Sequence, residues 1–98
     1  MAGIIYSRGL YPFMDKDSSV GIYGALKDIN EATSSGYYQV SGIDDTILNA
    51  PAGIYGYGNM VVFRNGGYTT QIFYPRSKEG KMAFRSFQDS SWFEWKIF

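Results

Sequence analysis

The stretch that decides the fold is residues 58–98, GNMVVFRNGGYTTQIFYPRSKEGKMAFRSFQDSSWFEWKIF. It contains short runs rich in β-branched and aromatic residues, separated by tight polar turns, and it closes on two tryptophans three residues apart. Runs of this kind favour strands, and polar turns join strands into hairpins. The stretch therefore predicts four short antiparallel strands, without an evident set of catalytic residues.

The strongest turn signal in this stretch is Asn65-Gly66-Gly67, which separates strands expected at 60–64 and 68–74. Asn-Gly suits a hairpin because both residues tolerate the positive φ of a type I′ turn. Alternation in the second strand places Tyr68, Thr70, Ile72 and Tyr74 on one face and Thr69, Gln71 and Phe73 on the other. Neither face is purely polar, so we expect both to be partly covered, with another subunit as one candidate cover.

Further elements are expected on both sides of this hairpin. Strands at 81–87 and 92–98 follow it, and alternation in the last one places Trp92 and Trp95 on opposite faces. Residues 37–40 form a fifth strand, and residues 25–32 are the one candidate for a short helical turn. The fold class expected is therefore mainly β: a small antiparallel meander of about five short strands with one short helical turn.

Two segments are harder to interpret. Residues 41–58 form a long connection with Pro51 and several glycines, which is either a loop folded back over the core or a functional loop. Residues 1–27 read as an extended N-terminal stalk or linker, in which 20–23 is a possible short strand. The expected domain therefore spans residues 28–98.

Composition excludes several function classes. The 98 residues are 45% hydrophobic, enough for one modest core, and nine basic residues balance nine acidic ones. Without a basic stripe, nucleic-acid binding is not expected. The chain has no cysteine and no histidine. Disulfides, thiolate metal sites and every Ser-His or Cys-His arrangement are therefore ruled out.

The acidic residues suggest neither catalysis nor metal binding. Asp44 and Asp45 are adjacent in a loop and cannot be assigned the facing geometry of a glycosidase pair. They also fall short of the six to eight oxygens of an ordinary calcium site. Glu94 stands between two aromatics, where a solvated or Arg-paired role is expected. We expect a protein that is not an enzyme, needs no cofactor and does not insert into a membrane, and we see no signal peptide in residues 1–8.

Carbohydrate binding is a more specific hypothesis than catalysis or metal binding. Sugars stack their apolar faces on aromatic rings while their hydroxyls require hydrogen-bond partners. The candidate ligand-binding residues are Tyr55, Tyr57, Trp92, Arg64 and Arg85. The competing interpretation places these rings in the core or at a subunit interface, which suits Trp95 best because it shares a face with Phe93 and Ile97.

The order of several short motifs resembles a known family. They are Asp28-Ile29-Asn30, Tyr37-Tyr38-Gln39-Val40-Ser41-Gly42, Asn49-Ala50-Pro51-Ala52-Gly53, Gln71, Lys81-Met82-Ala83-Phe84-Arg85 and Ser91-Trp92 with Trp95. Together they look like the knob domain of R-type pyocin tail fibres, a module also found in phage tail fibres. The resemblance covers residues 28–98 and leaves 1–27 outside.

This resemblance implies a β-rich knob on a homotrimeric fibre, in a virion or a phage-tail-like particle made in the host cytoplasm. Its partners would be other fibre or tail segments and a bacterial surface polysaccharide or teichoic acid. The expected function is therefore host adhesion through a surface glycan. The alternatives are a structural knob that only trimerises or spaces the fibre, and a free-standing carbohydrate-binding or inhibitor-like protein.

Overall fold

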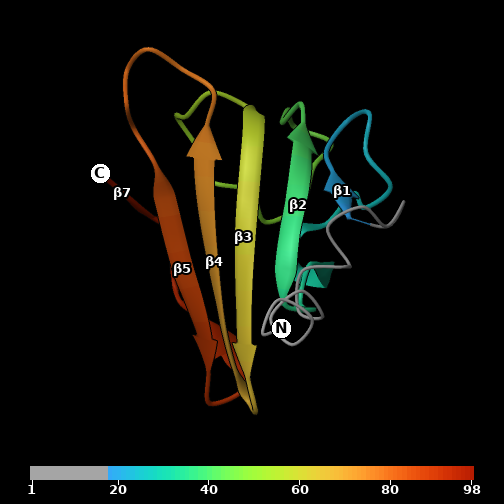
Figure 1. Cartoon of the computed structure of the whole chain (residues 1–98), viewed down its shortest axis with the longest axis vertical. Helices are drawn as coiled ribbons and strands as arrows, with labels where there is room; N and C mark the ends of the chain where they lie inside the picture. The colour runs from blue at the N-terminus through green and yellow to red at the C-terminus, as the bar shows by residue number, and fades with distance from the viewer. Residues whose placement is uncertain (1–17) are drawn as a thin grey trace, which may run out of the picture.

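Strands dominate the computed structural model, which describes residues 18–98. In chain order the elements are β1 (Ser19–Val20), the 3₁₀ turn η2 (Ile29–Glu31), β2 (Gly36–Ser41), β3 (Tyr57–Asn65), β4 (Tyr68–Pro75), β5 (Ala83–Gln88), β6 (Ser91–Trp92) and β7 (Lys96–Ile97). The strands form one sheet in the order β1-β2-β3-β4-β5-β6, with β7 also paired to β5. Figure 1 shows β1 to β5 side by side in this order. The mainly β prediction is confirmed.

The predicted antiparallel meander corresponds to β2 through β5, each paired antiparallel with the next. One edge of the sheet lies outside this meander, where β1 pairs parallel with β2 through Ser19↔Gln39 and Val20↔Val40. A parallel neighbour requires a crossover between the two strands. Residues 21–35, which include η2, provide that crossover, so the sheet is mixed.

The β3–β4 hairpin forms as predicted, but its loop lies one residue later than Asn65-Gly66. Asn65 pairs with Tyr68, which leaves Gly66 and Gly67 as the two loop residues. Gly66 has φ +64, whereas Gly67 does not adopt a positive φ of that kind. A single positive φ at the first central position is the pattern of a II′ turn, which glycine supports there. The strands therefore extend by one further pair.

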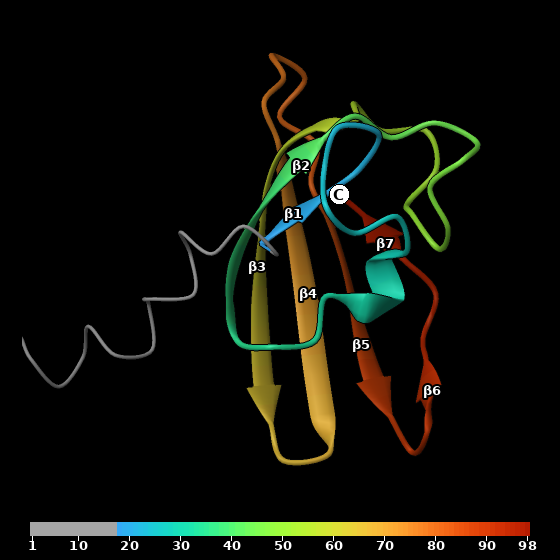
Figure 2. The same ribbon diagram turned by 90° about the vertical axis from the view of Figure 1, so that its right-hand side faces the viewer.

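The core lies on one face of the sheet. Tyr38, Met60, Phe73 and Ala83 form one row across β2 to β5, and all four are buried. Figure 2 shows η2, the 42–56 loop and the C-terminal strands on that same side, where Ile29, Ile47 and Trp95 pack against the row. Burying a side chain such as Phe73 contributes about 1.5–3 kcal/mol.

The candidate helix at 25–32 is reduced to η2. The Asp28 carboxylate accepts a hydrogen bond from the backbone N–H of Asn30, which caps the turn. Leu26 instead forms a bridge with Val20, so the residues before Asp28 follow the sheet edge. Because Val20 is fully buried, residues 18–27 pack on the sheet and do not extend from it. Residues 1–17 lie outside the described residues, and a domain boundary after residue 27 stays a prediction.

The last predicted strand, 92–98, is interrupted. β6 pairs with one end of β5 and β7 with the other, and residues 93–95 belong to neither strand. The Arg85 guanidinium lies 4.0 Å from the Trp92 ring centroid and 4.6 Å from that of Trp95. In a continuous strand, residues three apart would face opposite sides of the sheet. The break lets both indoles reach the same cation, so the prediction of opposite faces is wrong.

Candidate functional site

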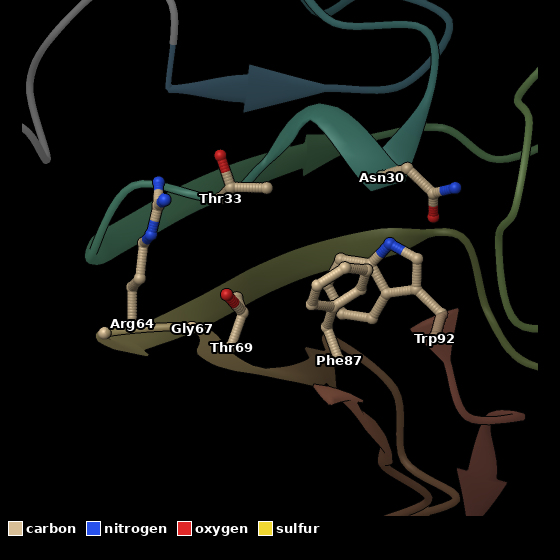
Figure 3. Close-up of a pocket in the computed structure, with 8 residues that line it drawn as sticks. Asn30, Thr33, Arg64, Gly67, Thr69, Phe87 and Trp92 are labelled. Carbon is tan, nitrogen blue, oxygen red and sulfur yellow. The ribbon is translucent and has the colours of Figure 1, made fainter. Parts of the chain in front are cut away.

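A pocket of about 340 Å³ opens on the core side of the sheet, near the β3–β4 turn. Figure 3 shows its walls. The lining residues come from η2 and the segment after it, from the hairpin, and from β5 and β6: Asn30, Thr33, Arg64, Gly66, Gly67, Thr69, Phe87 and Trp92. Two of the predicted site residues, Arg64 and Trp92, are therefore brought to one pocket.

Gln71 holds the η2 side of the pocket to the sheet. Its side chain is completely buried, and its amide Nε2 donates to the carbonyl oxygens of Ile29 at 2.8 Å and Ala32 at 2.9 Å. Its Oε1 accepts from Arg85 Nε at 2.8 Å. Buried polar groups require partners of this kind, and here the whole amide is satisfied. Gln71 is thus structural and does not supply a free polar group for a ligand.

Arg85 lies directly behind the pocket. It is 5% exposed, and its Nη2 donates to Asn30 Oδ1 at 2.7 Å. Burial lowers the pKa of Arg85 to about 10, an effect that the negative charge of Asp28 opposes. The guanidinium therefore remains charged at neutral pH. Although Arg85 is a predicted ligand contact, it does not line the pocket, and it contacts Trp92 and Trp95 instead.

Trp92 and Phe87 form the aromatic wall. They pair across β5 and β6, and their ring centroids are 5.3 Å apart with the planes inclined at 64°. The Trp92 ring also lies against the Arg85 guanidinium, and a cation over an indole face is attractive. The indole is therefore held in place from two sides while it stays only half-buried.

Arg64 stands at the opposite end of the pocket from these rings (Figure 3). It belongs to β3, where its backbone N–H donates to Ser35 Oγ at 2.8 Å. That contact fixes the backbone, and the exposed side chain carries its guanidinium beside Thr33. Thr69, the cross-strand partner of Arg64, places its hydroxyl on the pocket floor between the two ends.

Tyr55 and Tyr57 lie elsewhere. Their rings pack together with centroids 5.6 Å apart, at the start of β3. Arg64 is seven residues further along the same strand, a separation of roughly 23 Å at the usual rise per residue. The structure therefore does not place the two tyrosines with the Arg64–Trp92 pocket.

The connection between β2 and β3 folds back over the core, as one of the two interpretations predicts. It contributes Ile47 to the core, and it encloses a second hollow of about 370 Å³ lined largely by its own residues. Trp95 Nε1 donates to the carbonyl oxygen of Asn49 at 2.9 Å, which ties this loop to the C-terminal segment. Hydrogen bonds from Thr46 hold the pKa of Asp44 below its usual value.

The sequence gives weak signals for the remaining pocket residues. Nothing in the sequence indicates a binding role for Asn30, Thr33, Thr69 or Phe87, because short polar side chains near turns are common and Phe87 resembles any strand aromatic. Alternation puts Thr69 on one face with Gln71 and Phe73, and the structure shows that this is the core face, where Thr69 pairs with Phe87 of β5. The packing of η2 on this face depends on the hydrogen bond from Gln71 to the carbonyl of Ile29, and these two residues are 42 positions apart in the chain.

A comparison of the chain with protein-family models, with curated proteins and with solved structures finds no match in any of the three. Among residues 18–98, no three Asp or Glu side chains gather into a possible metal site. Over the same residues, no helix has the length and apolar character needed to cross a membrane.

Proposed function

We propose that this chain is a non-enzymatic β module of a phage tail fibre or phage-tail-like particle, and that it contributes to adhesion by binding a bacterial surface glycan. The observation that supports binding is the pocket beside Trp92. It combines an aromatic wall with hydroxyl, amide and guanidinium groups, the mixture that sugar rings and their hydroxyls require. The fibre setting depends on the sequence resemblance alone.

Adhesion through such a pocket would be weak for one copy. A volume of about 340 Å³ lies at the low end of the roughly 300–1,000 Å³ range of small-molecule sites, which suits one sugar unit. In a homotrimer, three pockets would act together, and effective concentration would raise the avidity without a new contact.

The test is a bacterial glycan array probed with the purified chain, with Trp92→Ala and with the matched control Phe93→Ala. Phe93 is the neighbouring exposed aromatic and does not line the pocket. We expect Trp92→Ala to weaken binding about tenfold, equivalent to about 1.4 kcal/mol, and Phe93→Ala to leave it unchanged. Circular dichroism checks that both variants fold. Absence of binding by the parent chain, or turnover of a bound glycan, would contradict the proposal.

The alternative function is a structural knob that only trimerises or spaces the fibre. A specific feature favours it: the sheet face opposite the core carries the cross-strand row Val61, Ile72 and Phe84, with the exposed Phe63 and Tyr74 beside it. Contiguous apolar surface of this kind is typical of protein interfaces. A stable oligomer that binds no glycan would support this alternative.

A further inference from the structure

The charge on the side chains that line the pocket is positive. Of the described residues that line it, Arg64 alone is charged, and no carboxylate faces the cavity. A second cation, Arg85, lies behind the Trp92 ring with its centre 4.0 Å from the ring centroid, and its charge is partly offset by Asp28, which does not line the pocket. The chain as a whole has no net charge, so this positive field is local. Clefts lined by one sign of charge concentrate ligands of the opposite sign.

The two cations have different roles. Arg85 is buried, donates through Nε to Gln71 and through Nη2 to Asn30, and does not line the cavity, so it contributes charge without touching a ligand. Arg64 is exposed, and its hydrogen bonds with Ser35 involve its backbone N–H and C=O. Its guanidinium is therefore the group that can bind an anion directly, and its planar fork suits a carboxylate or a phosphate.

The positions of the rings and of Arg64 define how a ligand would lie. Trp92 and Phe87 close one end of the pocket and Arg64 the other, with Thr69 between them (Figure 3). A sugar ring stacked on Trp92 would therefore direct a substituent toward the guanidinium, while Thr69 could bond a ring hydroxyl.

We propose that the pocket selects an acidic sugar unit, whose ring contacts Trp92 and Phe87 and whose anionic group binds Arg64. This deepens the proposed adhesion function and depends on it. The anion is either a carboxylate, as in a hexuronic acid, or a phosphate attached to a sugar. A neutral sugar would leave the guanidinium without its charged partner and lose a charge-assisted hydrogen bond.

The experiment follows the Trp92 indole N–H signal by NMR while the full chain is titrated with matched sugars. Glucuronate and galacturonate are compared with glucose and galactose, and glucose 6-phosphate tests the phosphate source. We expect an acidic sugar to bind at least tenfold more tightly than its neutral match, because a hydrogen bond between a guanidinium and an anion is stronger than one to a neutral hydroxyl. Added salt should reduce this difference.

Arg64→Gln should abolish the preference for the acidic sugar, because the substitution removes the cation that binds the anionic group. The matched control is Arg76→Gln, an exposed arginine that follows β4 at the other end of the hairpin. Tighter binding of the phosphate than of either uronate would assign the anion as phosphate. Equal binding of acidic and neutral sugars, or a preference that survives Arg64→Gln, would overturn this inference while glycan binding stands. If no sugar shifts the Trp92 signal and the glycan array is also negative, the proposed function fails with it.

Discussion

At the scale of single residues, Gln71 connects the fold to the pocket. Its amide joins the carbonyls of Ile29 and Ala32 to β4 and also accepts from Arg85. Arg85 in turn positions Asn30 and the two indoles. One buried amide therefore orders both walls of the pocket.

Replacing Gln71 with methionine preserves the volume but removes every one of these hydrogen bonds. The Ala32 carbonyl oxygen and the Arg85 Nε–H lose their partner, and the Ile29 carbonyl oxygen keeps only the backbone N–H of Ala32. Each unsatisfied buried group costs about 1–3 kcal/mol before relaxation. We expect the free energy of unfolding in urea to fall by about 3 kcal/mol. Gln39→Met, at an exposed position of β2, is the control and should change stability by less than about 0.5 kcal/mol. Equal stability of the two variants would show that the network is not intact in solution.

Asp44 offers a test of local electrostatics. Its Oδ1 accepts from both the backbone N–H and the hydroxyl of Thr46, and these bonds lower its pKa in the folded chain. A carboxyl whose folded pKa lies below its unfolded value stabilises the fold above the unfolded pKa. That contribution disappears as the pH falls through the folded pKa. Thr46→Val keeps the backbone bond and should raise the pKa of Asp44 toward its ordinary value in an NMR titration of the carboxyl carbon. An unchanged pKa would assign the effect to the backbone bond alone.

At the scale of secondary-structure elements, the close approach of β3 to the end of β4 requires a glycine. A Cβ added at Gly58 would lie 2.2 Å from the carbonyl oxygen of Tyr74 and 2.8 Å from the Cα of Pro75. Both are backbone atoms, so the strands would have to separate. We expect Gly58→Ala to destabilise the protein by about 2–3 kcal/mol, measured by thermal or urea unfolding. Gly67→Ala, which meets no atom within 4 Å, is the matched control. If both variants unfold alike, the paired register of β3 and β4 is incorrect.

Elements defined by local signals were predictable from the sequence. The glycine-rich turn and the alternation of residues 68–74 determine β3, β4 and the face that contains Phe73. Elements that depend on distant contacts were less predictable. The possible strand at 20–23 overlaps β1 only at Val20, because β1 has two residues and exists through the pairing of Val20 with Val40. The interruption at 93–95 brings both indoles to Arg85, a contact with no local signal in the residues around it.

At the scale of the whole molecule, the candidate site was only partly predictable. Aromatic and arginine residues could be recognised by chemistry, which identified Arg64 and Trp92. Arg64 and Trp92 come to line one pocket only when η2 packs on β4 and β5. That packing includes the hydrogen bond between Gln71 and Ile29, which are 42 residues apart in the chain. The same packing buries Arg85 and leaves Tyr55 and Tyr57 at the far end of β3.

The outer sheet face makes self-association testable for the whole molecule. Phe63 is 58% exposed beside the Val61–Ile72–Phe84 row, and a chain with no net charge has no long-range repulsion to keep copies apart. If three copies bury this face, light scattering should give about three times the chain mass of 11.0 kDa. Phe63→Lys should then shift the protein toward monomer, because the lysine charge would be buried in the interface without a partner. Tyr23→Lys, at an exposed position after β1, should leave the oligomer intact. A monomeric parent chain would argue against a trimer, and a trimer unaffected by Phe63→Lys would place the interface elsewhere.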